Sequence, residues 1–138
     1  MSDVQPMTSV ERPSPKQRPV YLSLARIRLP LPGIVSILHR ISGAALFLVG
    51  LPLLLYAVQT SLASPESFAT LDAMLATPFA KIVLIGLVWA YLHHFCAGLR
   101  FLLLDVHQFI ELRPTRQSSA VVLIVSLALT ALIGIRLW

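Results

Sequence analysis

The chain has 138 residues, of which 57% are hydrophobic and only 12% are charged, and its formal net charge is +5. A soluble domain of this length carries about one quarter charged residues, so the composition indicates an integral membrane protein without room for a separate catalytic domain. The single cysteine, Cys96, excludes an intrachain disulfide framework and a metal cluster made of cysteines alone.

Residues 1–32 form the first unit of the chain and contain no span. Residues 1–19 are polar and rich in proline, which predicts a flexible tail. This tail has neither the apolar core of a signal peptide nor the composition of a transit sequence, which favours a bacterial inner (cytoplasmic) membrane. Residues 20–32 mix Arg26 and Arg28 with leucines and predict an interfacial segment, where the basic charge meets lipid headgroups rather than nucleic acid.

Three long apolar stretches follow, and each has at least the roughly 20 residues that a helix needs to cross about 30 Å of hydrocarbon. The predicted helices cover residues 33–61, 78–104 and 118–137, so residues 33–138 are expected to form one three-helix transmembrane domain. Pro52 is expected to bend the first helix, because proline lacks a backbone donor and its ring clashes with the preceding turn. The fold class is therefore an all-α, multi-pass membrane protein.

The charges in the two connecting loops predict how the helices are oriented. The loop at residues 62–77 carries two acidic residues and no basic one, whereas the loop at residues 106–117 carries two arginines against one acid. The N-terminal side is also basic. Because basic loops stay on the cytoplasmic side, the N-terminus is expected inside and the C-terminus outside.

The sequence Ser36-Ile-Leu-His39-Arg40-Ile-Ser-Gly43 near the start of the first helix is the first candidate site. Ser36 and Arg40 are one helical turn apart and share a face with Gly43. A hydroxyl and a guanidinium on one face can bind a carbonyl, a phosphate or a carboxylate. The alternative is that Arg40 extends to lipid headgroups and Ser36 bonds back to its own helix.

The second candidate site lies in the second helix, where ionisable side chains occur in a segment apolar enough to span the membrane. His94 precedes Gly98 by one turn, so a flat cofactor has room to approach the backbone beside an imidazole that suits iron. A histidine hydrogen-bonded across the bundle and a proton-relay residue are the alternatives. Arg100 is placed to meet a haem propionate, to extend to the interface or to pair with Asp105.

A haem held by two histidines needs a second ligand. His39 and His93 are the candidates within the chain, and otherwise a partner subunit must supply it. His93 points about 100° away from His94, toward a neighbouring helix or lipid-side water. Cys96 is interpreted as a small packing residue. The sequence contains no glycine-rich phosphate loop, no nucleophile elbow and no zinc ligand set with standard spacing.

Two motifs, in this order on the first two helices, carry a family resemblance. They are the SxxHRxSG pattern from Ser36 to Gly43 and the HxxxGxR pattern from His94 to Arg100, which runs on to Asp105. With them, the chain after about residue 17 closely resembles the cytochrome b subunits of succinate dehydrogenase, one of the two small membrane anchors of bacterial respiratory complex II.

The resemblance implies a role for each matching residue. His94, rather than His93, would be the axial ligand of haem b, and Ser36 and Arg40 would line the ubiquinone pocket. His39 and Arg40 would lie close to the haem propionates. Family members often carry a histidine directly after the arginine of the second motif. Phe101 stands there in this chain, so no propionate contact carries over to that position.

The resemblance further implies a subunit that does not oxidise succinate by itself. It would dock the flavoprotein and iron–sulfur subunits, bind ubiquinone and share haem b with a second small anchor that supplies the other ligand. The alternatives are a purely structural anchor, a fumarate reductase anchor that works in the opposite direction, and a three-helix cytochrome for another partner. A purely structural anchor needs none of Ser36, Arg40 and His94.

Overall fold

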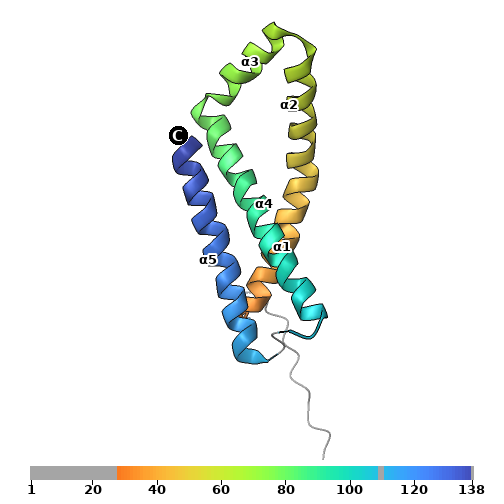
Figure 1. The fold of residues 1–138 in the computed structure, drawn as a ribbon, viewed down its shortest axis with the longest axis vertical. Coiled ribbons are helices and arrows are strands. Elements are labelled where there is room, and N and C mark those ends of the chain that lie inside the picture. Colours follow the sequence, from red (N-terminus) through yellow and green to blue (C-terminus); the bar gives the residue numbers. More distant parts are fainter. Residues whose placement is uncertain (1–27, 109–110, 138) are drawn as a thin grey trace, which may run out of the picture.

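The structure is a computed structural model that describes residues 28–108 and 111–137, so most of the predicted tail and interfacial segment lies outside the described residues. The described part is all-helical and contains three helices long and apolar enough to cross a membrane. Figure 1 shows α1 and α2 rising as one rod, α3 crossing the far end, and α4 and α5 running back and forth beside it. The bounds are α1 Leu31–Ala45, η2 Leu46–Gly50, α2 Leu51–Ala63, α3 Pro65–Leu75, α4 Pro78–Asp105 and α5 Leu112–Leu137.

The first span is continuous from Leu31 to Ala63 but contains a π-helical turn, η2, in its middle. The backbone N–H of Leu51 donates to the carbonyl of Leu46, five residues earlier. Pro52 follows directly. Because its ring crowds the preceding turn and it has no N–H to donate, the helix changes its hydrogen-bond register just before it. A bend was expected at Pro52, and the structure shows a change of hydrogen-bond register in the turn that precedes the proline.

The segment between the first two spans, predicted as a loop, is largely the helix α3. Ser64 caps it: the Ser64 hydroxyl accepts from the backbone N–H of Ser67, and the Ser67 hydroxyl accepts from the backbone N–H of Ser64. Hydrogen bonds from its own backbone N–H and from Ser64 lower the pKa of Glu66 in the first turn. A negative charge there also complements the helix dipole. The loop prediction was wrong because this reciprocal capping pair was overlooked.

The third span begins at Leu112, earlier than the predicted start near residue 118. Its first two turns are polar, and hydropathy alone therefore placed its beginning too late. The second span, predicted at residues 78–104, matches α4 closely.

The core lies at the end of the bundle where α1 begins and where α4 joins α5. Val35 of α1, Ala97 of α4 and Val122 of α5 meet there in one buried cluster. The buried face of α5 continues along Ser119, Ser126 and Thr130, whose small side chains let α4 approach closely. By contrast, α2 contributes no buried residue. The three helices are thus fixed to one another mainly at one end, and the candidate residues lie at that end.

The C-terminus of α4 contains a testable source of strain. His107 has a φ of 62°, and it is the only described non-glycine residue with a positive φ. The N–H of Gln108 donates to the Leu103 carbonyl at 2.9 Å, and the N–H of His107 donates to the Leu104 carbonyl at 3.0 Å. These two bonds form a Schellman motif, in which glycine is the preferred residue at the position of His107.

We expect His107→Gly to stabilise the protein by about 1 kcal/mol, since it removes the steric cost of a left-handed backbone at a residue with a Cβ. The measurement is the midpoint of thermal unfolding of the detergent-solubilised protein. His107→Ala is the matched control, because alanine keeps that cost while removing the imidazole. An equal gain from both variants would assign the effect to the side chain instead of the backbone.

Candidate functional site

His94 of α4 stacks directly on His39 of α1. The two ring centroids are 4.2 Å apart and the ring planes differ by 6°. The stack joins the two sequence motifs, which lie on different helices. Phe101 packs against the other side of this pair, with its ring centroid 5.2 Å from that of His39. The SxxHRxSG and HxxxGxR motifs therefore form one site.

The protonation of the His94 ring follows from its hydrogen bond. Nδ1 of His94 lies 3.0 Å from the carbonyl oxygen of His39. Because a carbonyl oxygen only accepts, Nδ1 must carry the proton, and Nε2 keeps its lone pair. The hydroxyl of Ser42 donates to the same carbonyl at 3.0 Å and lies 3.4 Å from Nδ1. A metal-binding histidine typically has this second contact, which fixes the tautomer and the ring orientation.

Gly43 and Gly98 leave the space that the two imidazoles occupy. A Cβ on Gly43 would lie 2.7 Å from Cε1 of His94 and 3.1 Å from its Nδ1. A Cβ on Gly98 would lie 3.7 Å from Nε2 of His39, which is ordinary contact. Only the glycine of the first motif is therefore required sterically by this arrangement. Ser42 and Gly43 belong to the first motif, but the sequence alone indicates no role at the imidazole for either of them.

His93 is fully buried between helices and faces away from this site. Its ring stacks on Trp89 at a centroid distance of 5.4 Å and faces the backbone of Val35 without a hydrogen bond of good geometry. The expectation that His93 faces a neighbouring helix is confirmed, and the alternative of lipid-side water is wrong. A side chain sealed between α1 and α4 cannot reach a cofactor that also contacts His94.

His39 is equally unsuited to be the second axial ligand in this arrangement. Two axial imidazoles approach an iron end-on from opposite faces of the porphyrin, whereas the rings of His39 and His94 lie flat against each other. Among the described residues, no group of three or more histidine, cysteine, aspartate or glutamate side chains is placed to hold a metal ion. Of the imidazoles at this site, the half-buried ring of His94 is the one whose Nδ1 is hydrogen-bonded and whose Nε2 keeps a lone pair for a metal.

This observation fits a role for His94 as a haem ligand. The ring has the tautomer that leaves Nε2 unprotonated, and the hydrogen bond at Nδ1 holds the ring in place. The alternative in which His94 is hydrogen-bonded across the bundle is also realised, through Nδ1 alone. The two interpretations are compatible, since the cross-helix bond is the contact that leaves Nε2 available.

Ser36 and Arg40 lie on α1 next to this site. Ser36 is half-buried and Arg40 is exposed. The expected back-bond from Ser36 to its own helix does not form, and among the described residues neither side chain has a hydrogen-bond or ion-pair partner. Within the part of the chain that the structure describes, a hydroxyl and a guanidinium without partners therefore lie one turn apart at the basic end of the bundle.

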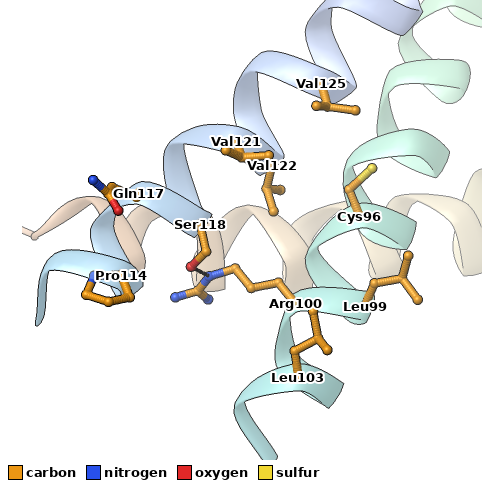
Figure 2. Close-up of a pocket in the computed structure, with 10 residues that line it drawn as sticks. All are labelled: Cys96, Leu99, Arg100, Leu103, Pro114, Gln117, Ser118, Val121, Val122 and Val125. Carbon is orange, nitrogen blue, oxygen red and sulfur yellow. Dashed lines mark hydrogen bonds between the residues drawn. The ribbon is translucent and has the colours of Figure 1, made fainter. Parts of the chain in front are cut away.

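Arg100 points toward Ser118 of α5 (Figure 2), and its guanidinium carbon also lies 5.5 Å from the centroid of the Phe101 ring. Its Nε donates to the Ser118 hydroxyl at 3.0 Å and its Nη2 to the Thr115 carbonyl at 3.4 Å. The guanidinium is buried, with 4% of the residue exposed. It forms no ion pair with Asp105, which is exposed, so the alternative in which these two residues pair is not found in the described structure. Cys96 is half-buried against the core cluster, which confirms its role in packing.

The chain is similar to known membrane subunits along most of its length. The sequence profile of the family described as succinate dehydrogenase/fumarate reductase transmembrane subunit matches residues 14–133. A succinate dehydrogenase cytochrome b556 subunit from Coxiella burnetii is 36% identical over 123 residues, which cover 88% of this chain and 98% of the relative. The protein of the same name from Paracoccus denitrificans is 35% identical over 115 residues, covering 83% and 88% of the two chains.

Proposed function

Because the chain belongs to the family of succinate dehydrogenase/fumarate reductase transmembrane subunits, we propose that it is the cytochrome b anchor of a succinate:ubiquinone oxidoreductase. In this role it docks the flavoprotein and iron–sulfur subunits to the membrane, contributes one ligand to haem b and forms part of the ubiquinone site. Succinate is oxidised elsewhere in the complex. The single observation that supports this proposal most strongly is the His94 imidazole, whose Nδ1 is held by the His39 carbonyl.

His94 is the axial haem ligand in this proposal, through Nε2. Haem b, when bound, supplies a one-electron carrier within the membrane. The chain's own residues orient the ligand: the His39 carbonyl and Ser42 hold Nδ1, and Gly43 leaves room for the ring. His39 and Arg40 are proposed to lie near the haem propionates. Arg100 remains a candidate for the same role, although its guanidinium would have to leave Ser118 to take it.

The second axial ligand is proposed to come from the other small anchor subunit. The flat stacking of His39 on His94 and the burial of His93 between helices support this, because neither arrangement suits a second histidine ligand to a haem held by His94. The partner would then cover the half-exposed ring of His94.

Ser36 and Arg40 are proposed to bind ubiquinone. The guanidinium would hold and polarise one quinone carbonyl, and the hydroxyl would donate a hydrogen bond that strengthens as negative charge develops on that oxygen. Their lack of partners among the described residues supports this, because both donors are available to a ligand. Electrons would arrive from flavin and iron–sulfur clusters on the inner side of the membrane.

The orientation that we propose is N-terminus inside and C-terminus outside, in a bacterial inner membrane. The start of α1 and the α4–α5 connection lie at one end of the bundle, and α3 lies at the other (Figure 1). The basic end is thus shared by the N-terminal side and the second loop, which matches the distribution that the positive-inside rule requires. The iron–sulfur subunit would dock at this end.

The quinone assignment is tested by comparing two assays on the purified complex. We expect Arg40→Leu to lower succinate:ubiquinone activity about 10- to 100-fold, as for the loss of a hydrogen bond from a charged donor, and Ser36→Ala about fivefold. Succinate oxidation with an artificial acceptor that bypasses the membrane should stay near the unmodified level. Arg116→Leu removes an exposed arginine from the same end of the bundle and should change neither assay. Equal loss in both assays would mean an assembly defect and would contradict the assignment.

A further inference from the structure

A cavity of about 550 Å³ lies between α4 and α5, away from the histidine pair. Apolar side chains form most of its wall, among them Leu99 and Leu103 of α4 and Val121 and Val125 of α5 (Figure 2). Between 40% and 56% of each of these four residues is exposed. The cavity is therefore a groove that opens to the lipid side of the helices, and its walls suit a hydrocarbon chain.

The polar end of this groove is built around the buried guanidinium of Arg100. Gln117 and Ser118 line the groove beside it. Arg100 is 4% exposed, and its two hydrogen bonds to Ser118 and Thr115 go to neutral groups. Asp105 and Glu111, the acidic residues nearest in sequence, are exposed, and no described residue forms an ion pair with Arg100. The guanidinium also lies 5.5 Å from the centroid of the Phe101 ring, which carries no charge. A buried charge is costly without a counter-charge, so the described residues favour an anion beside Arg100.

The groove lies on a different side of α4 from the imidazole of His94. Arg100 follows His94 by six residues, which places it about 120° around the helix from the imidazole. His94 faces α1 and Arg100 faces α5. Arg100 also lies only five residues before the end of α4, so its charge is about one and a half turns from the basic membrane interface.

We propose that this groove binds an anionic phospholipid. Its phosphate pairs with Arg100 and accepts from Gln117, and one acyl chain lies along Leu99, Val121 and Val125. Arg113 precedes Gln117 by four residues and so shares its face of α5, where it adds a second positive charge at headgroup depth. A neutral quinone would fill the apolar wall but would leave the charge of Arg100 uncompensated, which favours the phospholipid.

The test is native mass spectrometry of the intact complex, released from the membrane in mild detergent, with the bound phospholipids counted for each complex. We expect Val121→Phe, which fills the groove from an exposed position, to lower the retained anionic phospholipid about tenfold. Ile124→Phe makes the same change at an exposed position on α5 that does not line the groove, and it should retain the lipid. Both variants should keep the unmodified haem spectrum and quinone activity, so the result does not depend on the proposed function.

A second measurement addresses the headgroup. Delipidated complex is titrated with phosphatidylglycerol or with phosphatidylcholine, which have the same chains but differ in net charge. We expect a preference of about tenfold for phosphatidylglycerol. Arg100→Gln keeps N–H donors for Ser118 and Thr115 but removes the charge, and it should abolish that preference. The proposal would be overturned if Val121→Phe and Ile124→Phe retained the phospholipid equally, or if the two lipids bound with equal affinity. It would also be overturned if a quinone were found in place of the phospholipid.

Discussion

Replacing His94 with leucine should remove the haem signal from the purified complex while the chain still inserts into the membrane. Nε2 of His94 is the proposed ligand atom, because Nδ1 of the same ring is held by the His39 carbonyl and His93 is buried between helices. The loss of one of two axial ligands removes or severely perturbs a six-coordinate haem. Leucine keeps the apolar character of the span, so insertion should be unaffected. The measurement is the visible absorption spectrum together with the haem content of each purified complex.

The adjacent histidine provides the matched control. His93→Phe keeps a flat ring against Trp89 and removes two ring nitrogens that lack partners of good geometry, so we expect it to fold and to retain haem. Haem lost in the His93 variant and retained in the His94 variant would reverse the assignment. An unchanged spectrum in the His94 variant would remove this chain from haem ligation altogether.

The second large effect is expected from one added methyl group. In Gly43→Ala the new Cβ would lie 2.7 Å from Cε1 of His94, which is closer than nonbonded carbon atoms approach. The added Cβ would also lie 3.1 Å from Nδ1, so we expect the imidazole to shift and to weaken its hydrogen bond to the His39 carbonyl, which fixes its tautomer. Loss of such an outer contact typically costs about 10- to 100-fold in metal affinity, so haem occupancy should fall and the remaining spectrum should shift.

Gly86→Ala is the control for this substitution. It makes the same chemical change in α4, where an added Cβ would meet no atom within 4 Å. Alanine also favours a helix over glycine by about 1 kcal/mol, so this variant should be as stable as the unmodified protein or more so. If Gly43→Ala bound haem as well as Gly86→Ala does, the close approach at Gly43 would have no functional importance.

Much of the fold could be predicted from hydropathy and helix length. The span at α4 was predicted within one residue of each end, and the distortion before Pro52 follows from proline stereochemistry. The helix α3 could not be found in this way, because it is short and its start depends on the side chains of Ser64 and Ser67. A capping pair of two serines carries less signal than the usual serine and glutamate.

The two motifs of the candidate site were predicted from the sequence, but their contact with each other was not. Spacing along one helix places Ser36 beside Arg40, but nothing in that spacing indicates that His39 stacks on His94, 55 residues away. The positions of residues on one helix also do not identify partners that lie on another helix. Arg100 and Asp105 are close in sequence, yet the guanidinium of Arg100 turns to Ser118 of α5. These contacts depend on how the helices pack against one another, which residue spacing in a single sequence does not predict.

The most direct test of the central proposal is a reduced-minus-oxidised visible spectrum of the complex purified through this chain, with succinate as the only reductant. We predict a b-type haem signal in a preparation that also contains the flavoprotein, the iron–sulfur subunit and a second small anchor. That result would connect this chain to an electron path that starts at succinate. The same partners without haem would show a purely structural anchor, and haem that succinate does not reduce would assign this cytochrome to a different electron donor. The first outcome would contradict the haem ligation proposed for His94, and the second would contradict the proposed electron path from succinate.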